Sequence, residues 1–116
     1  MSIIFRNILL DLKKLDGVKM IAIGSRDGFL ISESNSSESE ILTLMSAAML
    51  RAAENVTGKL GKVSPIRVIV DFEGGKIITT LAGHKALISV TTSMDANIEP
   101  IIREIDRTAG KLKDIL

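Results

Sequence analysis

This chain has no cysteine, no tryptophan and no tyrosine, and it contains only two prolines and one histidine. Without cysteine, neither a disulfide framework nor a thiolate metal site can form. A single histidine cannot build a histidine-rich metal site. The only aromatic side chains are three phenylalanines, and we expect all three in the core rather than on a platform that stacks nucleotide bases. These absences argue against metal chemistry, a cofactor site and nucleic-acid binding.

An excess of charge of one sign is also lacking, because 15 basic residues nearly balance 14 acidic ones and the net charge is +1. No global field therefore draws the chain to nucleic acid or to an anionic membrane. No stretch approaches the roughly 18 apolar residues of a transmembrane helix. The first apolar stretch is soon interrupted by Arg6 and Asp11 and does not have the pattern of a secretory signal. We expect a cytoplasmic protein with no membrane insertion.

Three stretches have the apolar spacing of amphipathic helices. The first covers residues 3–15 and is followed by Gly17, which is suited to the end of a helix. Its apolar side chains are Phe5, Ile8, Leu9, Leu12 and Leu15. The second and longest runs from residue 38 to about residue 60, and Ser37 has the position of its cap in a capping box. The third lies within residues 93–116.

Five shorter stretches alternate in the way expected of β-strands. They cover residues 18–24, 29–33, 66–72, 76–82 and 85–91. A turn containing Asp27-Gly28 joins the first two and predicts a hairpin, and short glycine-containing turns join the last three and predict a meander. The strands of the meander carry apolar side chains on both faces, so the sheet must be covered on both sides.

The order helix-β-β-helix-β-β-β-helix predicts the fold class. Three amphipathic helices can cover the two faces of one sheet, since each buries one apolar stripe. We therefore expect an α+β protein, a three-layer α/β/α sandwich with a five-stranded antiparallel sheet. With 46% hydrophobic and 25% charged residues, the chain has the composition of one globular domain over residues 1–116.

The long central helix is apolar on more than one side. One stripe, which we expect to face the core, is formed by Ile41, Met45, Ala48, Met49, Ala52, Val56 and Leu60. Leu44, Ala47 and Leu50 fall outside this stripe at about 100° per residue. A helix with apolar residues on its outer side is either deeply buried or covered by a partner. We favour a partner; the alternative is that Leu44 and Ala47 lie on the shoulder of the core face.

The order of these elements, together with four local motifs, resembles the roadblock/LC7 domain family over essentially the whole chain. The motifs are Leu15-Asp16-Gly17-Val18, the Asp27-Gly28 hairpin, the alanine-rich helix of residues 41–53 and Gly74-Gly75 in the meander. The resemblance implies the strand order 2-1-5-4-3 and a non-enzymatic protein that dimerises through its long second helix and third strand. It also implies a scaffold or regulator of small Ras-like GTPases, or a subunit of a motor or membrane-tethered complex. Bacterial members of the family raise the GTPase activity of their partner.

The stretch 66–72 supports dimerisation independently of that resemblance. If it forms an edge strand, the strand is long and apolar, and Pro65 protects only its start. Soluble proteins usually blunt such edges with charge, a bulge or proline. Antiparallel pairing with the same strand of a second copy would remove this liability. We therefore predict a homodimer whose interface contains Leu44, Ala47, Leu50, Ile66, Val68, Val70 and Phe72.

No group of residues has the pattern of a catalytic site, so we expect no enzymatic activity. His84 falls in a predicted turn with no carboxylate nearby in the sequence. Asp71 and Glu73 share a strand face, but they lie beside a Gly-Gly turn, where surface charge explains them more simply. Beyond a second copy of itself, we therefore expect the chain to bind another protein rather than a substrate.

The resemblance suggests a small Ras-like GTPase as that partner. We expect it to contact the exposed part of the long helix, where Arg51, Glu54 and Lys59 form a polar rim. Two alternatives stay open. One is a sensory domain that binds a small ligand, although no aromatic or convergent polar set marks a pocket. The other is a purely structural subunit of a larger complex.

Overall fold

The structure, a computed structural model, describes residues 2–32, 36–61 and 63–116, with side chains described from Arg6 onward in the first helix. Seven elements follow one another in these residues: α1 (Ser2–Lys13), β1 (Val18–Ser25), α2 (Ser37–Lys59), β2 (Arg67–Phe72), β3 (Gly75–Ala82), β4 (Ala86–Ser93) and α3 (Ile98–Ile115). The side chain of Phe5, predicted to face the core, and Glu33, predicted to end a strand, lie outside the described part of the chain.

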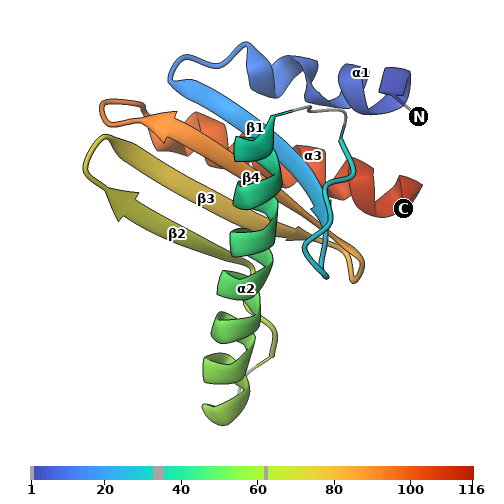
Figure 1. Cartoon of the computed structure of the whole chain (residues 1–116), viewed down its shortest axis with the longest axis vertical. Helices are drawn as coiled ribbons and strands as arrows, with labels where there is room; N and C mark the ends of the chain where they lie inside the picture. Colours follow the sequence, from blue (N-terminus) through green and yellow to red (C-terminus); the bar gives the residue numbers. More distant parts are fainter. Residues whose placement is uncertain (1, 33–35, 62) are drawn as a thin grey trace.

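The elements form three layers, as the sequence predicts (Figure 1). α2 lies on one face of the sheet, and α1 and α3 lie on the other. The sheet is antiparallel throughout, with the order β1-β4-β3-β2. This is the order that the family resemblance implies once the second expected strand is left out. β1 and β2 are therefore the two outer strands of the described sheet.

The number of strands is the main correction to the predicted fold, because the sheet has four strands and not five. Of the expected strand 29–33, the described residues contribute only a single bridge, between Leu30 and Gly24. The hydroxyl of Ser32 accepts a hydrogen bond from the Ile23 amide at 3.1 Å. Serine hydroxyls compete with backbone ladders in this way. Two backbone bonds still join the segment to β1, from the Ser25 amide to the Phe29 carbonyl at 2.8 Å and from the Ile31 amide to the Ile23 carbonyl at 2.7 Å, and the Ser32 hydroxyl takes the place of the next ladder bond.

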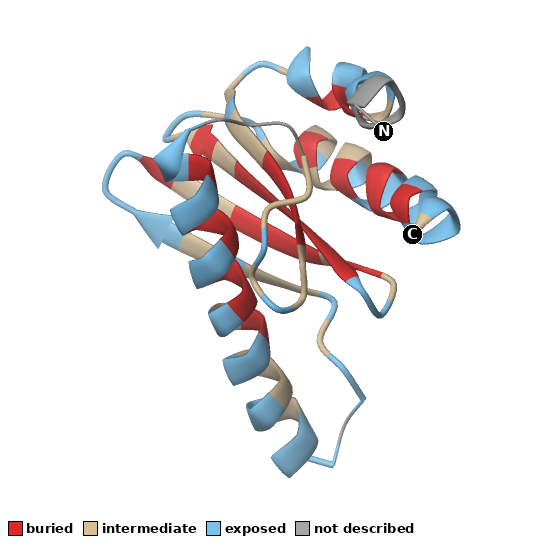
Figure 2. Ribbon diagram, turned by 45° about the vertical axis from the view of Figure 1, so that its right-hand side comes forward, coloured by how far each residue is buried: buried red, intermediate tan, exposed pale blue. Residues whose placement is uncertain are grey.

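The two faces of the sheet are covered very differently (Figure 2). The larger cluster of buried side chains joins α1 and α3 to the sheet and includes Leu12, Ile23, Ile78, Ile88, Val90, Ile105 and Leu112. In the described residues, the cluster beneath α2 has only Ala47, Leu50 and Leu87 as buried members, with Val68 and Leu81 packed against it. Hydrophobic stabilisation grows with the apolar area buried. α1 and α3 are therefore held to the sheet more strongly than α2 is.

Small and hydroxylated side chains fill the rest of the space between α2 and the sheet. Ser46 of α2 and Ser89 of β4 lie 2.8 Å apart between their Oγ atoms, and Thr79 of β3 donates to Ser46 at 3.1 Å. Thr79 and Ser89 are 2.9 Å apart, which completes a fully buried triangle of hydroxyls. Thr43 packs so closely on Gly24 that a methyl group at Gly24 would overlap it. Short side chains and hydrogen bonds therefore pack α2 closely against the sheet at these positions.

The start of α2 differs by one residue from the prediction. Ser37, predicted as the cap, is the first helical residue, and Ser36 takes the cap position instead. The Ser36 hydroxyl accepts a hydrogen bond from the Ser39 amide at 3.1 Å, which satisfies one of the free amides of the first turn. Gly17 has a φ of 90°, as predicted for a residue that ends a helix and leads into a strand.

Candidate protein-interaction surface

The structure reverses the predicted orientation of α2. Ala47 and Leu50, predicted to face outward, are buried against the sheet with exposures of 1% and 2%. The buried face of the helix consists of Ser39, Leu42, Thr43, Ser46, Ala47 and Leu50. The outward placement of Ala47 and Leu50 is therefore wrong. The physical reason is that the strands present small and hydroxylated side chains to α2, and a matching face packs there more closely than a row of large side chains.

The large apolar side chains of α2 consequently lie on its outer surface. Ile41, Met45, Ala48, Ala52 and Val56 follow one another at intervals of three or four residues, and all are exposed. The exposed fraction is 60% for Ile41, 51% for Met45 and 58% for Val56. We call these five residues the α2 stripe, and Figure 2 shows the side of α2 that faces away from the sheet as exposed. A large apolar patch on a surface marks a site of interaction, so the α2 stripe is the first part of the candidate surface.

The outer strand β2 is the second part. Its position at the end of the strand order agrees with the predicted edge strand. Val68 packs against the cluster beneath α2, so Ile66, Val70 and Phe72 lie on the same face of the sheet by alternation. Ile66 is 68% exposed and Phe72 is 47% exposed, while Val68 and Val70 are half-buried. The four predicted interface residues thus lie together at one edge, on the side of the sheet that α2 covers.

The turn after β1 carries an exposed aromatic side chain that the sequence did not predict. Phe29 is 72% exposed, and Phe72 is also largely exposed, so the expectation that every phenylalanine lies in the core is wrong for both. Leu44, the one predicted outward residue of α2 that remains exposed, lies beside this turn, within reach of a methyl group built on Gly28. The Asp27-Gly28 turn is the signal that could have placed Phe29 at a solvent-exposed tip.

Polar contacts tie α2 to the same turn. Arg26 forms an ion pair with Glu54, and Arg51 donates from Nη1 to the Arg26 carbonyl at 3.3 Å. Of the predicted polar rim, Arg51 and Lys59 are exposed, whereas Glu54 is half-buried in the ion pair. At about 100° per residue, Arg51 and Glu54 occupy a flank of α2 that is separate from the α2 stripe. The helix therefore presents two surfaces, one apolar and one polar.

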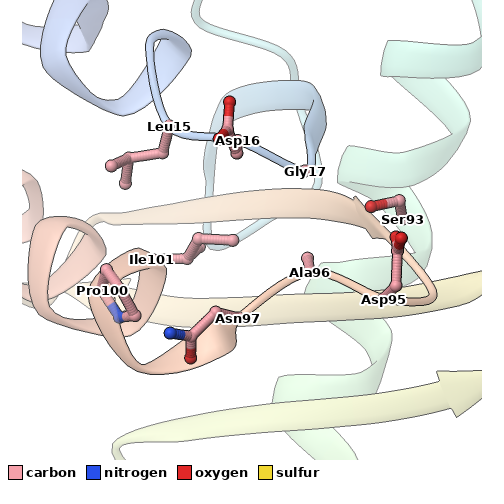
Figure 3. Close-up of a pocket in the computed structure, with 9 residues that line it drawn as sticks. All are labelled: Leu15, Asp16, Gly17, Ser93, Asp95, Ala96, Asn97, Pro100 and Ile101. Carbon is pink, nitrogen blue, oxygen red and sulfur yellow. The ribbon is translucent and has the colours of Figure 1, made fainter.

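A hollow of about 580 Å³ lies on another side of the molecule, between the turn after α1 and the start of α3. Its polar lining includes Asp16, Asp95 and Asn97, which are exposed, and Pro100 and Ile101 form part of its apolar wall (Figure 3). None of the described residues that line it is a phenylalanine. A ligand pocket usually combines apolar walls with a few buried polar groups, so this open hollow does not favour the sensory alternative.

Of the residues weighed as catalytic candidates, Asp71 and Glu73 lie at the β2–β3 hairpin and His84 lies in the β3–β4 turn, at the other end of β3. Asp71 forms an ion pair with Lys76 across the β2–β3 hairpin, and Glu73 is exposed in the turn between them. His84 is exposed in the β3–β4 turn, where its carbonyl accepts from Arg26 Nη1 at 3.4 Å. In the described part of the chain, no three histidine or carboxylate side chains gather as a metal site would require. None of its helices has the length and apolar character that crossing a membrane demands.

Residues 4–92 match the family model of the roadblock/LC7 domain. The chain belongs to the roadblock/LC7 domain family. This membership confirms the resemblance carried by the motifs of the sequence. The roadblock/LC7 domain described here is 29% identical over 108 residues to the uncharacterized protein MJ0310 of Methanocaldococcus jannaschii, an alignment that covers 91% of this chain and 94% of that protein.

Solved structures of roadblock/LC7 proteins share the fold. The TM-score is 0.88 with a structure of MglB in a tetrameric arrangement, at 17% identity and covering 98% of this chain and 88% of that one. It is 0.86 with a roadblock/LC7 domain from Streptomyces avermitilis, at 10% identity and covering 99% of this chain and 96% of that one. At such identities the likeness establishes the fold of this roadblock/LC7 domain.

Proposed function

We propose that this roadblock/LC7 domain is a non-enzymatic homodimer that regulates or scaffolds a small Ras-like GTPase. The observation that carries the proposal is a long helix whose large apolar side chains face outward beside an unpaired outer strand. Family membership supplies the GTPase as the class of partner, as the resemblance in the sequence implies. The α2 stripe, together with Ile66, Val68, Val70 and Phe72, forms the dimer interface.

A second copy of the chain is the occupant that satisfies both parts of this surface. An outer strand of one copy can pair antiparallel with the same strand of another about a two-fold axis, because such an interface is self-complementary. That pairing brings the two α2 helices to the same face of the joined sheets. The tetrameric arrangement of MglB, a structural relative, supports association between copies of this fold.

The polar flank of α2 and the turn after β1 form the surface we assign to the GTPase. Phe29 projects from this turn, and Arg51 lies beside it through its bond to the Arg26 carbonyl. Aromatic and arginine side chains are the commonest energetic anchors of protein interfaces. This flank faces away from the α2 stripe, so it stays accessible in the dimer. Lys59, exposed in the last turn of α2, follows Val56 by three residues and Ala52 by seven, so it lies on the side of the α2 stripe and not on this flank.

The dimer is tested by placing a charge in the α2 stripe. We expect wild-type protein to sediment as a dimer at micromolar concentration and Ala48→Glu to sediment as a monomer with unchanged circular dichroism, because a buried unpaired carboxylate is costly. Asn7→Glu, which adds the same charge on the exposed surface of α1, is the matched control and should remain dimeric. A wild-type monomer under these conditions would contradict the proposal.

The GTPase surface is tested with small Ras-like GTPases from the source organism, loaded with GDP or a non-hydrolysable GTP analogue. Phe29→Ser should weaken binding by about tenfold or more, since aromatic anchors at interfaces commonly contribute that much. Met94→Ser removes an exposed apolar side chain elsewhere, 65% exposed, and should leave affinity unchanged. If wild-type dimer binds none of these GTPases and a metabolite co-purifies instead, the sensory alternative replaces the proposal.

A further inference from the structure

The outer edge of β2 presents a defined set of backbone groups that bond to no other strand of the described sheet. The Leu81 amide donates to the Ile66 carbonyl at 3.2 Å, and the β2–β3 ladder continues from there in regular register. Bonded and non-bonded pairs alternate along an antiparallel ladder. The even-numbered residues of β2 therefore bond to β3, while Arg67, Ile69 and Asp71 direct their amide and carbonyl groups away from the sheet. We call these three residues the outer ladder.

We propose that two copies pair through the outer ladder with Ile69 on the two-fold axis. Ile69 then faces the partner's Ile69, and Arg67 faces the partner's Asp71. This inference rests on the proposed dimer and adds its register, which is the property that makes the surface specific for a second copy of the same chain. Every outer-ladder residue then has a bonding partner, because the three positions are symmetric about Ile69.

Charge excludes two of the other symmetric registers. An axis through Arg67 places that side chain opposite the partner's Arg67, and an axis through Asp71 places two carboxylates opposite each other. Like charges directly opposite on a sheet are destabilising. With the axis at Ile69, Arg67 and Asp71 each lie opposite a residue of opposite charge in the partner.

Backbone geometry disfavours the two remaining registers. An axis through Val68 places Asp71 opposite the partner's Pro65, which has no amide hydrogen to donate. An axis through Val70 extends the pairing to Glu73, which lies in the turn beyond the end of β2. Both registers therefore pair fewer groups than the register centred on Ile69.

The ion pairs already present within each copy extend across this junction. Arg67 holds Asp106 of α3 through two bonds, of 2.6 Å and 3.1 Å, and Asp71 is paired with Lys76 of β3. In the proposed register the charges line up as Asp106, Arg67, the partner's Asp71 and the partner's Lys76, alternating in sign. Ile69, 42% exposed in the single chain, is covered between the two symmetric rows of charge.

The opposite face of the junction is apolar. The register places Val68 opposite the partner's Val70 and Ile66 opposite the partner's Phe72. Ile66 and Phe72 are exposed in the single chain, and each would cover the other. Cross-strand aromatic and β-branched pairs of this kind stabilise antiparallel sheets. The four side chains continue the apolar surface that packs beneath α2.

Single cysteines test the register directly, because the chain has no cysteine of its own. Residues 67–71 are each replaced by cysteine, and the dimers are oxidised mildly and separated on a non-reducing gel. We expect Ile69→Cys to form the disulfide-linked dimer in high yield, since directly opposed bonded residues have Cα atoms about 5.5 Å apart, within disulfide range. The other four single variants should cross-link poorly.

The outcomes separate the register from the dimer. A high yield from another position, or no cross-link from Ile69→Cys in a protein that sediments as a dimer, would overturn the register and leave the dimer intact. A wild-type monomer would overturn both. Circular dichroism of each variant identifies a protein that fails to fold. If a cysteine variant fails to fold, the register is tested with charge variants instead.

A pair of charge reversals gives the second measurement. Asp71→Lys places a cation opposite the partner's Arg67 and should weaken the dimer by about tenfold, counting both symmetric contacts. Glu73→Lys makes the same change of charge in the neighbouring turn and should have little effect. A dimer weakened by Glu73→Lys but not by Asp71→Lys would place the axis at Val70. Equal weakening by the two variants would show that the register does not depend on the pairing of Arg67 with Asp71.

Discussion

At the scale of single residues, glycine and hydroxyl side chains determine how closely α2 approaches the sheet. Gly24 has no side chain, and Thr43 fills the space that a methyl group would need. Thr43 cannot move away easily, because it is fully buried and its hydroxyl donates to the Ser39 carbonyl at 2.8 Å. The contact between Thr43 and Gly24 therefore sets how closely α2 packs against β1.

We predict that Gly24→Ala destabilises the domain by about 1–3 kcal/mol, the usual cost of overpacking a closed site. Gly110→Ala is the matched control, because nothing lies within 4 Å of a methyl group there and the position is helical. It should stabilise the domain by about 0.5–1 kcal/mol. Chemical denaturation measures both free energies of unfolding. An unchanged stability for Gly24→Ala would show that α2 can shift away from β1 without cost.

At the scale of secondary-structure elements, α2 depends on a few specific contacts. The ion pair between Arg26 and Glu54 joins its second half to the turn after β1. Within that turn, the Gly28 amide donates to the Ser25 carbonyl at 3.0 Å and the Phe29 amide to the Ser25 hydroxyl at 3.1 Å. The orientation of the exposed Phe29 therefore depends on how firmly α2 holds the turn.

We predict that Glu54→Gln loosens this turn while changing the global stability by at most about 1 kcal/mol, as expected for a partly exposed ion pair. The amides of Gly28 and Phe29 should exchange faster with solvent in a hydrogen-exchange measurement, because their bonds open when the turn detaches. Lys59→Gln, an equally conservative change at an exposed position of α2, should leave both amides unchanged. Equal exchange in the two variants would show that the ion pair does not hold the turn.

The three layers could be predicted from the sequence pattern, and the order of the four observed strands from the family resemblance, whereas the orientation of α2 could not. Periodicity identifies the faces of a helix, but it does not show which face meets the sheet when both are apolar. Here the buried face carries Thr43 and Ser46, whose hydroxyls are matched by Thr79 and Ser89 on the strands. That match becomes visible only when elements distant in the sequence are brought together.

The missing strand has a comparable cause. The alternation of residues 29–33 is typical of a strand, and the turn before it was placed correctly. The bond from the Ile23 amide to the Ser32 hydroxyl depends on the path of the chain after that turn, which local pattern does not determine. The edge position of β2, in contrast, was implied by the strand order of the family that the sequence resembles, and the structure places β2 at the end of the sheet.

At the scale of the whole molecule, the outward α2 stripe would make stability depend on the proposed association of two copies. The apolar cluster beneath α2 is small, so burial of the stripe by a second copy would contribute much of the apolar area that α2 buries. A protein whose folded form binds itself is stabilised by mass action.

We predict that the melting temperature of the wild-type domain rises by several degrees between about 1 µM and 100 µM protein, because only the folded state dimerises. Ala48→Glu should melt at a temperature that does not depend on concentration. Differential scanning calorimetry at several concentrations measures this. A wild-type melting temperature that stays constant over the range would contradict coupling between folding and pairing.

The hydroxyl of Ser32 has a consequence for how far such an assembly can grow. Once two copies join through β2, each end of the combined sheet is a β1 strand, and an open β1 edge would recruit further chains and build a filament. At Ile23 that edge is already engaged, since the Ser32 hydroxyl and amide bond to the Ile23 amide and carbonyl. Lys19, exposed near the other end of β1, adds a charge of the kind that deters strand addition. The same side chain that shortens the sheet by one strand thus terminates it, so the proposed pairing closes at two copies.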